Sequence, residues 1–164
     1  MKVLASTFGI SNDGSRAGVV TFSYNSEHSI KLKDHTDIGS FNKAVDKIPL
    51  MGSTTRIDKA LRLTQGELFE TSNGARPGIP KLLILLTDGS QTADTDAEDP
   101  GDIADELRSS GIRMLVIGIG SGINQTELNH IAGGDKFSFS AASFEELISS
   151  EFVKEIVEGS CNLG

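Results

Sequence analysis

The chain has 164 residues, of which 37% are hydrophobic. That is enough for the core of one ordinary domain and too much for a disordered segment. The formal net charge of −8 disfavours unaided nucleic-acid binding, which needs a basic face. With no tryptophan and one tyrosine, recognition that depends on aromatic stacking is disfavoured as well. No apolar run approaches the roughly 20 residues that a membrane-spanning helix needs.

The first half of the chain predicts a hairpin followed by helices. Valine and aromatic residues favour a strand in "AGVVTFSY", and "HSIKL" alternates as its hairpin partner would. Apolar residues at helical spacing then predict two amphipathic helices. The expected elements are a helix end at 1–10, a turn at 11–16, strands at 17–24 and 28–32, helices at 37–48 and 55–69, and a loop at 71–80.

The second half alternates buried strands with helices. The unbroken apolar run at 82–86 is typical of a strand buried on both faces of a parallel sheet. The further expected elements are a helix at 100–111, a buried strand at 112–120, a short helix at 124–134, a short strand at 136–140 and a closing helix at 143–159. Ser143 is the predicted N-cap of the closing helix, with Glu146 in the capping-box position.

This alternation predicts the fold class. Strands separated by helices indicate a doubly wound α/β fold, with a mainly parallel sheet and helices on both faces. The early hairpin supplies one antiparallel edge strand.

Asp88 is the first candidate functional residue, because it follows the buried strand at 82–86 and precedes Gly89. Ligands of open α/β sheets bind at the carboxyl ends of the strands. Aspartate before glycine is also common as a simple turn cap. Local sequence alone leaves both interpretations open.

Other motifs give weaker signals. The segment "GIGSG" at 118–122 has its third glycine one residue too early for a dinucleotide fingerprint. His28, His35 and His130 show no zinc-ligand spacing. The acidic run "DTDAEDPGD" at 94–102 does not match the EF-hand pattern. A solvated loop whose charges suit a helix start is the favoured interpretation, and weak calcium attraction stays open.

"NQT" makes Asn124 a glycosylation acceptor if the protein is secreted. Cys161, the only cysteine, is either a reduced thiol or half of a disulfide to something outside this chain.

Five blocks together resemble a family. In order they are "DGSRAGVVTFS", "MGSTTRIDKAL", "LLILLTDGSQ", "ELRSSGIRMLVIGIG" and "ELNHIAGGDKFSFSAASFEEL". Their order and spacing over nearly the whole chain resemble a von Willebrand factor type A domain. The resemblance is to the extracellular branch, found in matrix collagens, matrilins and integrin inserted domains.

The resemblance implies a metal-ion-dependent adhesion site. In the family, the aspartate after this strand acts with a threonine from an earlier loop and with a D-x-S-x-S motif after the first strand. Asp88 matches the aspartate and Thr55 the threonine, with Thr54 as the neighbouring alternative. The implied cofactor is Mg²⁺, with Ca²⁺ or Mn²⁺ as substitutes, and a carboxylate of a partner protein completes its oxygen shell.

The sequence departs from the family at its start. No D-x-S-x-S occurs in the 164 residues, and residues 1–20 match the end of the family's first helix and the segment after that helix. We therefore expect residues 1–164 to form a single domain of this family that lacks the central first strand and most of the first helix, as a fragment would. In extracellular members a cysteine after the last helix often pairs with one before the first strand, which suits Cys161.

The resemblance implies a non-catalytic protein-binding module of a secreted adhesion or matrix protein. Expected partners are an extracellular-matrix or cell-surface protein, such as collagen or an acidic side chain of a partner, and not nucleic acid or the membrane interior. With an incomplete site, metal binding by this chain should be weak or absent.

One alternative is a Mg²⁺-dependent receiver-like or phosphatase-like enzyme that uses Asp88. The strand ends at Ile119 and Phe139, however, are followed only by Gly, Ser and Ala rather than by the lysine such enzymes need. Another alternative is a purely structural module with a dead metal site.

Overall fold

The computed structural model describes residues 1–52 and 54–161. The chain divides into two compact units, Met1–Ile79 and Pro80–Gly164. That residues 1–164 act as one domain stays a prediction. None of the described helices combines the length and the apolar composition that a bilayer crossing requires.

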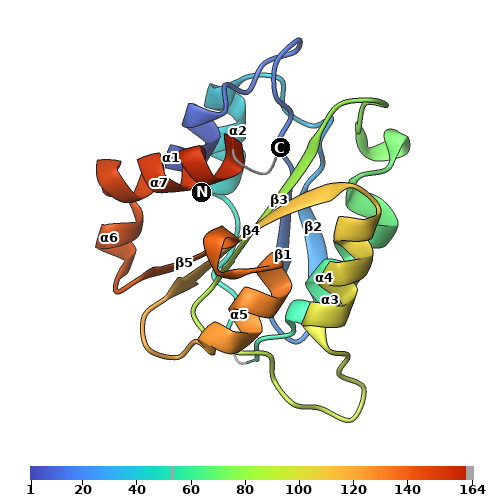
Figure 1. Ribbon diagram of the computed structural model, residues 1–164. Coiled ribbons are helices and arrows are strands. Elements are labelled where there is room, and N and C mark those ends of the chain that lie inside the picture. The colour runs from blue at the N-terminus through green and yellow to red at the C-terminus, as the bar shows by residue number, and fades with distance from the viewer. Residues whose placement is uncertain (53, 162–164) are drawn as a thin grey trace. The chain divides into compact units, whose positions relative to one another are not determined.

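The first unit is built on an antiparallel hairpin (Figure 1). Its elements are α1 (Lys2–Thr7), β1 (Val19–Phe22), β2 (Ser26–Ile30), α2 (Ile38–Val45), α3 (Ile57–Leu63), a π-helical turn (Thr64–Leu68) and a 3-10 turn (Thr71–Asn73). The core of the unit gathers Ile10, Val19, Ile30 and Phe41, all nearly inaccessible to solvent. The predicted strand pair and helices are therefore confirmed, with boundaries shifted by a few residues.

Helix α2 begins at an aspartate cap that should make its stability depend on pH. The carboxylate of Asp37 accepts hydrogen bonds from the Ser40 hydroxyl at 2.6 Å and the Ser40 N–H at 2.8 Å. These two bonds lower the pKa of Asp37 from its usual 3.8. A carboxyl group with a lowered folded-state pKa stabilises the fold above its unfolded-state pKa, and this contribution is lost as the pH falls through the folded-state value.

We therefore expect Asp37→Ala to destabilise the protein at neutral pH and to have less effect once the wild-type carboxylate is protonated. Urea unfolding at neutral pH and at a pH below the folded-state pKa of Asp37 measures this difference. Asp13→Ala, which removes an exposed carboxylate that caps no helix, is the control. An Asp37→Ala effect that does not change with pH would contradict the role of the ionised carboxylate.

The second unit is built on a three-stranded parallel sheet in the order β3-β4-β5. Its elements are β3 (Lys81–Thr87), α4 (Pro100–Ser109), β4 (Ile112–Ile119), α5 (Gln125–Ala132), a 3-10 turn (Asp135–Phe137), β5 (Ser138–Ala141), α6 (Phe144–Leu147) and α7 (Ser150–Cys161). Helices α4, α5 and α7 all contact β4. Successive β4 residues, from Met114 to Ile119, are buried. Because their side chains alternate between the faces of the sheet, both faces are covered at β4.

The predicted α/β class, with a parallel sheet and an antiparallel hairpin, is confirmed. The described residues form two sheets, however, and no strand among them pairs with the second edge of β1 or of β3. Strand β3 also departs from the prediction of burial on both faces. Of its five central apolar residues, Leu82–Leu86, only Leu85 is buried. A strand paired along one edge is less enclosed than β4, which has a neighbour on each side.

The prediction of a single closing helix at 143–159 is wrong. Ser143 does cap a helix, and its hydroxyl accepts from the Glu146 N–H at 3.3 Å. That helix, α6, ends after one turn, and α7 begins at Ser150. Ser149 supplies the reason, because its hydroxyl accepts from the Phe152 N–H at 3.3 Å as a second N-cap would. The capping box also differs in detail, since the Glu146 carboxylate accepts from the N–H of Ala142 rather than from that of Ser143.

Candidate functional site

Asp88 lies where the parallel strand β3 ends. Thr87, the last strand residue, is buried, and its hydroxyl both donates to the Gly89 carbonyl and accepts from the Gly89 N–H. This local pairing turns the chain sharply after the strand. Asp88 itself is exposed. The structure therefore presents a solvent-accessible carboxylate at the carboxyl end of the strand, where the fold class places ligands.

The loop after β4 supports the Asp88 turn. Thr87 and Gly118 are register partners, so the carboxyl ends of β3 and β4 meet at the same edge of the sheet. Gly122 approaches the Asp88 carbonyl so closely that a Cβ atom on residue 122 would lie 2.7 Å from that oxygen. The Ser90 hydroxyl donates to the Gly122 carbonyl at 3.3 Å. Gly122 of the "GIGSG" segment thus allows the two loops to pack closely.

The threonine loop lies in the first unit, immediately before α3. The hydroxyl oxygen of Thr54 is buried and has no hydrogen-bond partner among the described residues. Thr55 is half-buried and has a partner. A buried hydroxyl without a partner costs free energy unless a water or an ion satisfies it. This observation suits an oxygen-liganded ion near the loop, and it makes Thr54 as strong a candidate as Thr55.

Thr55 and Asp88 belong to different units of the chain, and a shared metal site stays a prediction. Their hydroxyl and carboxylate oxygens are the donor types that Mg²⁺ prefers. Two protein oxygens are nevertheless few for an ion that takes six ligands. The donor types of Thr55 and Asp88 therefore suit Mg²⁺, but two donors predict weak binding.

The structure describes the side chain of Asn124 but not that of Cys161. Asn124 is exposed, and its side-chain oxygen caps α5 by accepting from the N–H groups of Thr126 at 3.1 Å and Glu127 at 3.3 Å. The cap explains this asparagine without a glycan, and its glycosylation stays a prediction. Cys161 is the last residue of α7. Its side chain lies outside the part of the chain that the structure describes, so its disulfide also stays a prediction.

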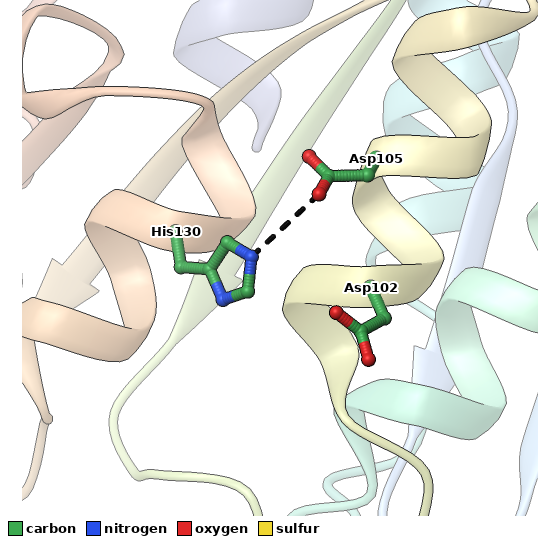
Figure 2. Close-up of side chains that lie close together, drawn as sticks. All are labelled: Asp102, Asp105 and His130. Atoms are coloured by element: carbon green, nitrogen blue, oxygen red, sulfur yellow. Dashed lines mark ion pairs between the residues drawn. The ribbon is translucent and has the colours of Figure 1, made fainter.

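A second group of polar side chains was not predicted from the sequence. Asp102 and Asp105 on α4 and His130 on α5 place one potential metal-ligating atom each within 4.8 Å of one another (Figure 2). His130, which shows no zinc-ligand spacing in the sequence, therefore has two carboxylate neighbours in the structure. The available signal was the i, i+3 spacing of the two aspartates, which puts them on one helical face. The histidine is 25 residues further on and joins them only because α4 packs against α5.

The family model of the von Willebrand factor type A domain matches residues 1–155. Among curated relatives, the chain is 34% identical over 140 residues to von Willebrand factor A domain-containing protein 2 of Xenopus laevis. It is 32% identical to the human collagen alpha-5(VI) chain and to matrilin-1 of Gallus gallus. These matches cover 85%, 92% and 75% of this chain. The chain spans only 17%, 6% and 24% of the lengths of these relatives.

Several solved structures are also similar to this chain. Proximal thread matrix protein 1 from the mussel byssus is 29% identical, with a TM-score of 0.85 over 98% of this chain and 39% of that chain. The same protein has been solved with a zinc-occupied MIDAS motif, at 28% identity and a TM-score of 0.83 over 97% of this chain and 38% of that chain. The manganese-loaded TRAP protein of Plasmodium vivax is 26% identical, with a TM-score of 0.74 over 96% of this chain and 62% of that chain.

Proposed function

Because the chain belongs to the von Willebrand factor type A domain family, we propose that it is a non-catalytic protein-binding module of a secreted adhesion or extracellular-matrix protein. The observation that carries the proposal is Asp88, an exposed carboxylate at the carboxyl end of a parallel strand of this family's fold. Relatives that include a collagen VI chain and a matrilin support a matrix setting.

The proposed site uses Asp88 with Thr55 or Thr54 as ligands of Mg²⁺ or a related divalent ion. When bound, the ion supplies a coordination position that a carboxylate of a partner protein can fill. The proposed partner is accordingly a matrix or cell-surface protein that presents an acidic side chain, with collagen as the first candidate. A glycan on Asn124 and a disulfide at Cys161 belong to the same proposal, since both require an extracellular setting.

We expect the 164-residue chain to bind Mg²⁺ at millimolar concentrations or more weakly, because two protein oxygens offset little of the cost of dehydrating the ion. A chain extended at its N-terminus by a strand ending in D-x-S-x-S should bind Mg²⁺ more tightly and should bind immobilised collagen in an EDTA-sensitive manner. Asp88→Ala in the extended chain should abolish both activities with little loss of folding, because the side chain is exposed. Isothermal titration and solid-phase binding measure these steps.

Thr54→Val and Thr55→Val in the extended chain separate the two threonine candidates, because each removes one hydroxyl at nearly constant volume. Asp13→Ala, which removes a carboxylate far from Asp88 in the sequence, is the control for charge. Tight Mg²⁺ binding by the short chain would contradict the view that its site is incomplete. Collagen binding that persists in EDTA or in Asp88→Ala would contradict the metal-dependent mechanism.

A further inference from the structure

The group formed by Asp102, Asp105 and His130 lies wholly within the second unit and does not include Asp88. Figure 2 shows the two aspartates on successive turns of α4, with the imidazole of His130 directed at them from α5. We propose that these three side chains form a separate site for a divalent transition-metal ion such as Zn²⁺. This inference does not depend on the proposed adhesion function.

The geometry of the ligand atoms suits such an ion. His130 Nε2 and Asp105 Oδ2 are 3.7 Å apart, which is too long for a hydrogen bond. Two atoms bound to one tetrahedral Zn²⁺ at about 2.05 Å each are separated by about 3.4 Å. The carboxylate of Asp102 has no hydrogen-bond or ion-pair partner among the described residues and can turn toward the same point. Three protein ligands and a solvent molecule make an ordinary open zinc site.

The imidazole ring of His130 lies against the backbone of α4. It packs directly over Gly101, and a Cβ atom on that residue would overlap the ring at Nδ1, Cε1 and Cγ. Asp99 Oδ1 lies 3.9 Å from His130 Nδ1, which is too long for a hydrogen bond, and it accepts from the Gly101 N–H at 2.7 Å. The other ring nitrogen, Nε2, is the one that lies near Asp105 Oδ2. Nε2 is therefore the nitrogen assigned to the ion.

Arg108 ties the two helices together at the same place. Its guanidinium pairs with Asp105 Oδ1, which leaves Oδ2 facing His130. It also donates to the backbone carbonyls of His130, at 3.2 Å, and of Ile131. One side chain thus holds both a ligating carboxylate and the backbone of the ligating histidine. Asp105 and the backbone at His130 are thus held before an ion arrives, which reduces the cost of binding.

Local charge favours a dication. The carboxylates of Asp99, Asp102 and Asp105 all lie near the imidazole of His130, and the guanidinium of Arg108 pairs with Asp105. With the imidazole neutral, three negative charges less one positive charge leave two negative charges to be balanced. Asp102 also stabilises the first turn of α4 through the helix dipole, but that role requires neither Asp105 nor His130. The nitrogen ligand selects Zn²⁺, Co²⁺ or Ni²⁺ over Mg²⁺ and Ca²⁺, which prefer oxygen throughout.

The test is a Zn²⁺ titration of the 164-residue chain carrying Asp88→Ala, so that binding at the adhesion site does not contribute. Calorimetry should show one saturable site in the micromolar range or tighter, with no comparable response to Mg²⁺ or Ca²⁺. His130→Gln should weaken binding about tenfold or more, and Asp102→Asn or Asp105→Asn by several-fold or more. His35→Gln and Asp135→Asn, which remove the same groups elsewhere, should leave the affinity unchanged.

Gly101→Ala gives the sharpest test, because it keeps every ligand and improves helix propensity. Its methyl group should displace the imidazole ring and lower the Zn²⁺ affinity several-fold, with circular dichroism unchanged. Nitrogen NMR should show that Zn²⁺ shifts His130 Nε2 in the parent chain. The proposal is overturned if no saturable Zn²⁺ binding occurs up to millimolar concentration, or if His130→Gln binds as the parent does. Zn²⁺ binding that requires Asp88 would assign the ion to the adhesion site and would also overturn the proposal.

Discussion

Asp58→Ala should lower the free energy of unfolding by about 3 to 5 kcal/mol, since it breaks a buried ion pair from one side. Arg56 and Asp58 are 1% and 2% exposed. The guanidinium donates from Nε to Oδ1 at 2.9 Å and from Nη2 to Oδ2 at 2.7 Å, which is the bidentate geometry of a strong pair. Truncating the aspartate removes both bonds and leaves the arginine charge without the carboxylate that faces it. Denaturant unfolding followed by circular dichroism measures the loss.

The double variant Arg56→Met, Asp58→Leu is the informative control. Replacing both members of a buried pair by apolar residues removes the two charges together, and such replacements are often nearly neutral. The double variant should therefore be more stable than Asp58→Ala alone. If the two are equally unstable, the loss comes from the shape of the site and not from an uncompensated charge.

This ion pair bears on the candidate adhesion site because it follows Thr54 and Thr55 directly. Arg56 occupies the N-cap position of α3, and its backbone N–H donates to the Ser23 carbonyl in the hairpin turn at 3.1 Å. The loop that carries the two threonines is thus anchored at its end by a buried side chain and by a backbone bond. A loop that is held in this way keeps a threonine hydroxyl in a defined position, which favours its use as a metal ligand.

The sequence was sufficient to predict features that depend on local pattern. Apolar runs and helical spacing predicted the strands and most helices, and the order of motif blocks predicted the family. Asp88 could be identified because strand, carboxylate and glycine are contiguous. The break at Ser149 was missed because two N-cap signals lie six residues apart, and an amphipathic pattern that runs through both predicts one helix.

Features that depend on distant contacts were not predictable. The bidentate pair of Arg56 and Asp58 looks in the sequence like two ordinary charges at the start of a helix. His130 gains its aspartate neighbours only through the packing of α5 on α4, and the position of its ring depends on Gly101 having no side chain. Arg56 and Asp58 are only two residues apart, but their burial depends on what packs around them. The meeting of His130 with its aspartates depends on tertiary packing as well.

Ile131→Ala should destabilise the protein by about 2 to 5 kcal/mol, as truncation of a fully buried isoleucine does when the cavity cannot collapse. Ile131 is 0% exposed on α5, and that helix contacts both α4 and β4. The buried residues of those two elements have little freedom to move, because Ile103, Leu107 and Leu115 are also 0% exposed. The variant deletes apolar contacts and leaves a void inside the second unit. Urea unfolding in EDTA measures the packing contribution alone, without any stabilisation by bound metal.

Ile148→Ala is the matched control, since Ile148 is 61% exposed and its truncation should change stability by no more than about 0.5 kcal/mol. The comparison also separates packing from ligand geometry at the neighbouring His130. Because His130 is exposed while Ile131 is buried in the core, Ile131→Ala should lower the unfolding midpoint in EDTA, whereas His130→Gln should not. An Ile131→Ala effect no larger than that of Ile148→Ala would mean that α5 is not part of the cooperative core, and the arrangement of α4 and α5 that brings the aspartates to His130 would then lose its physical basis.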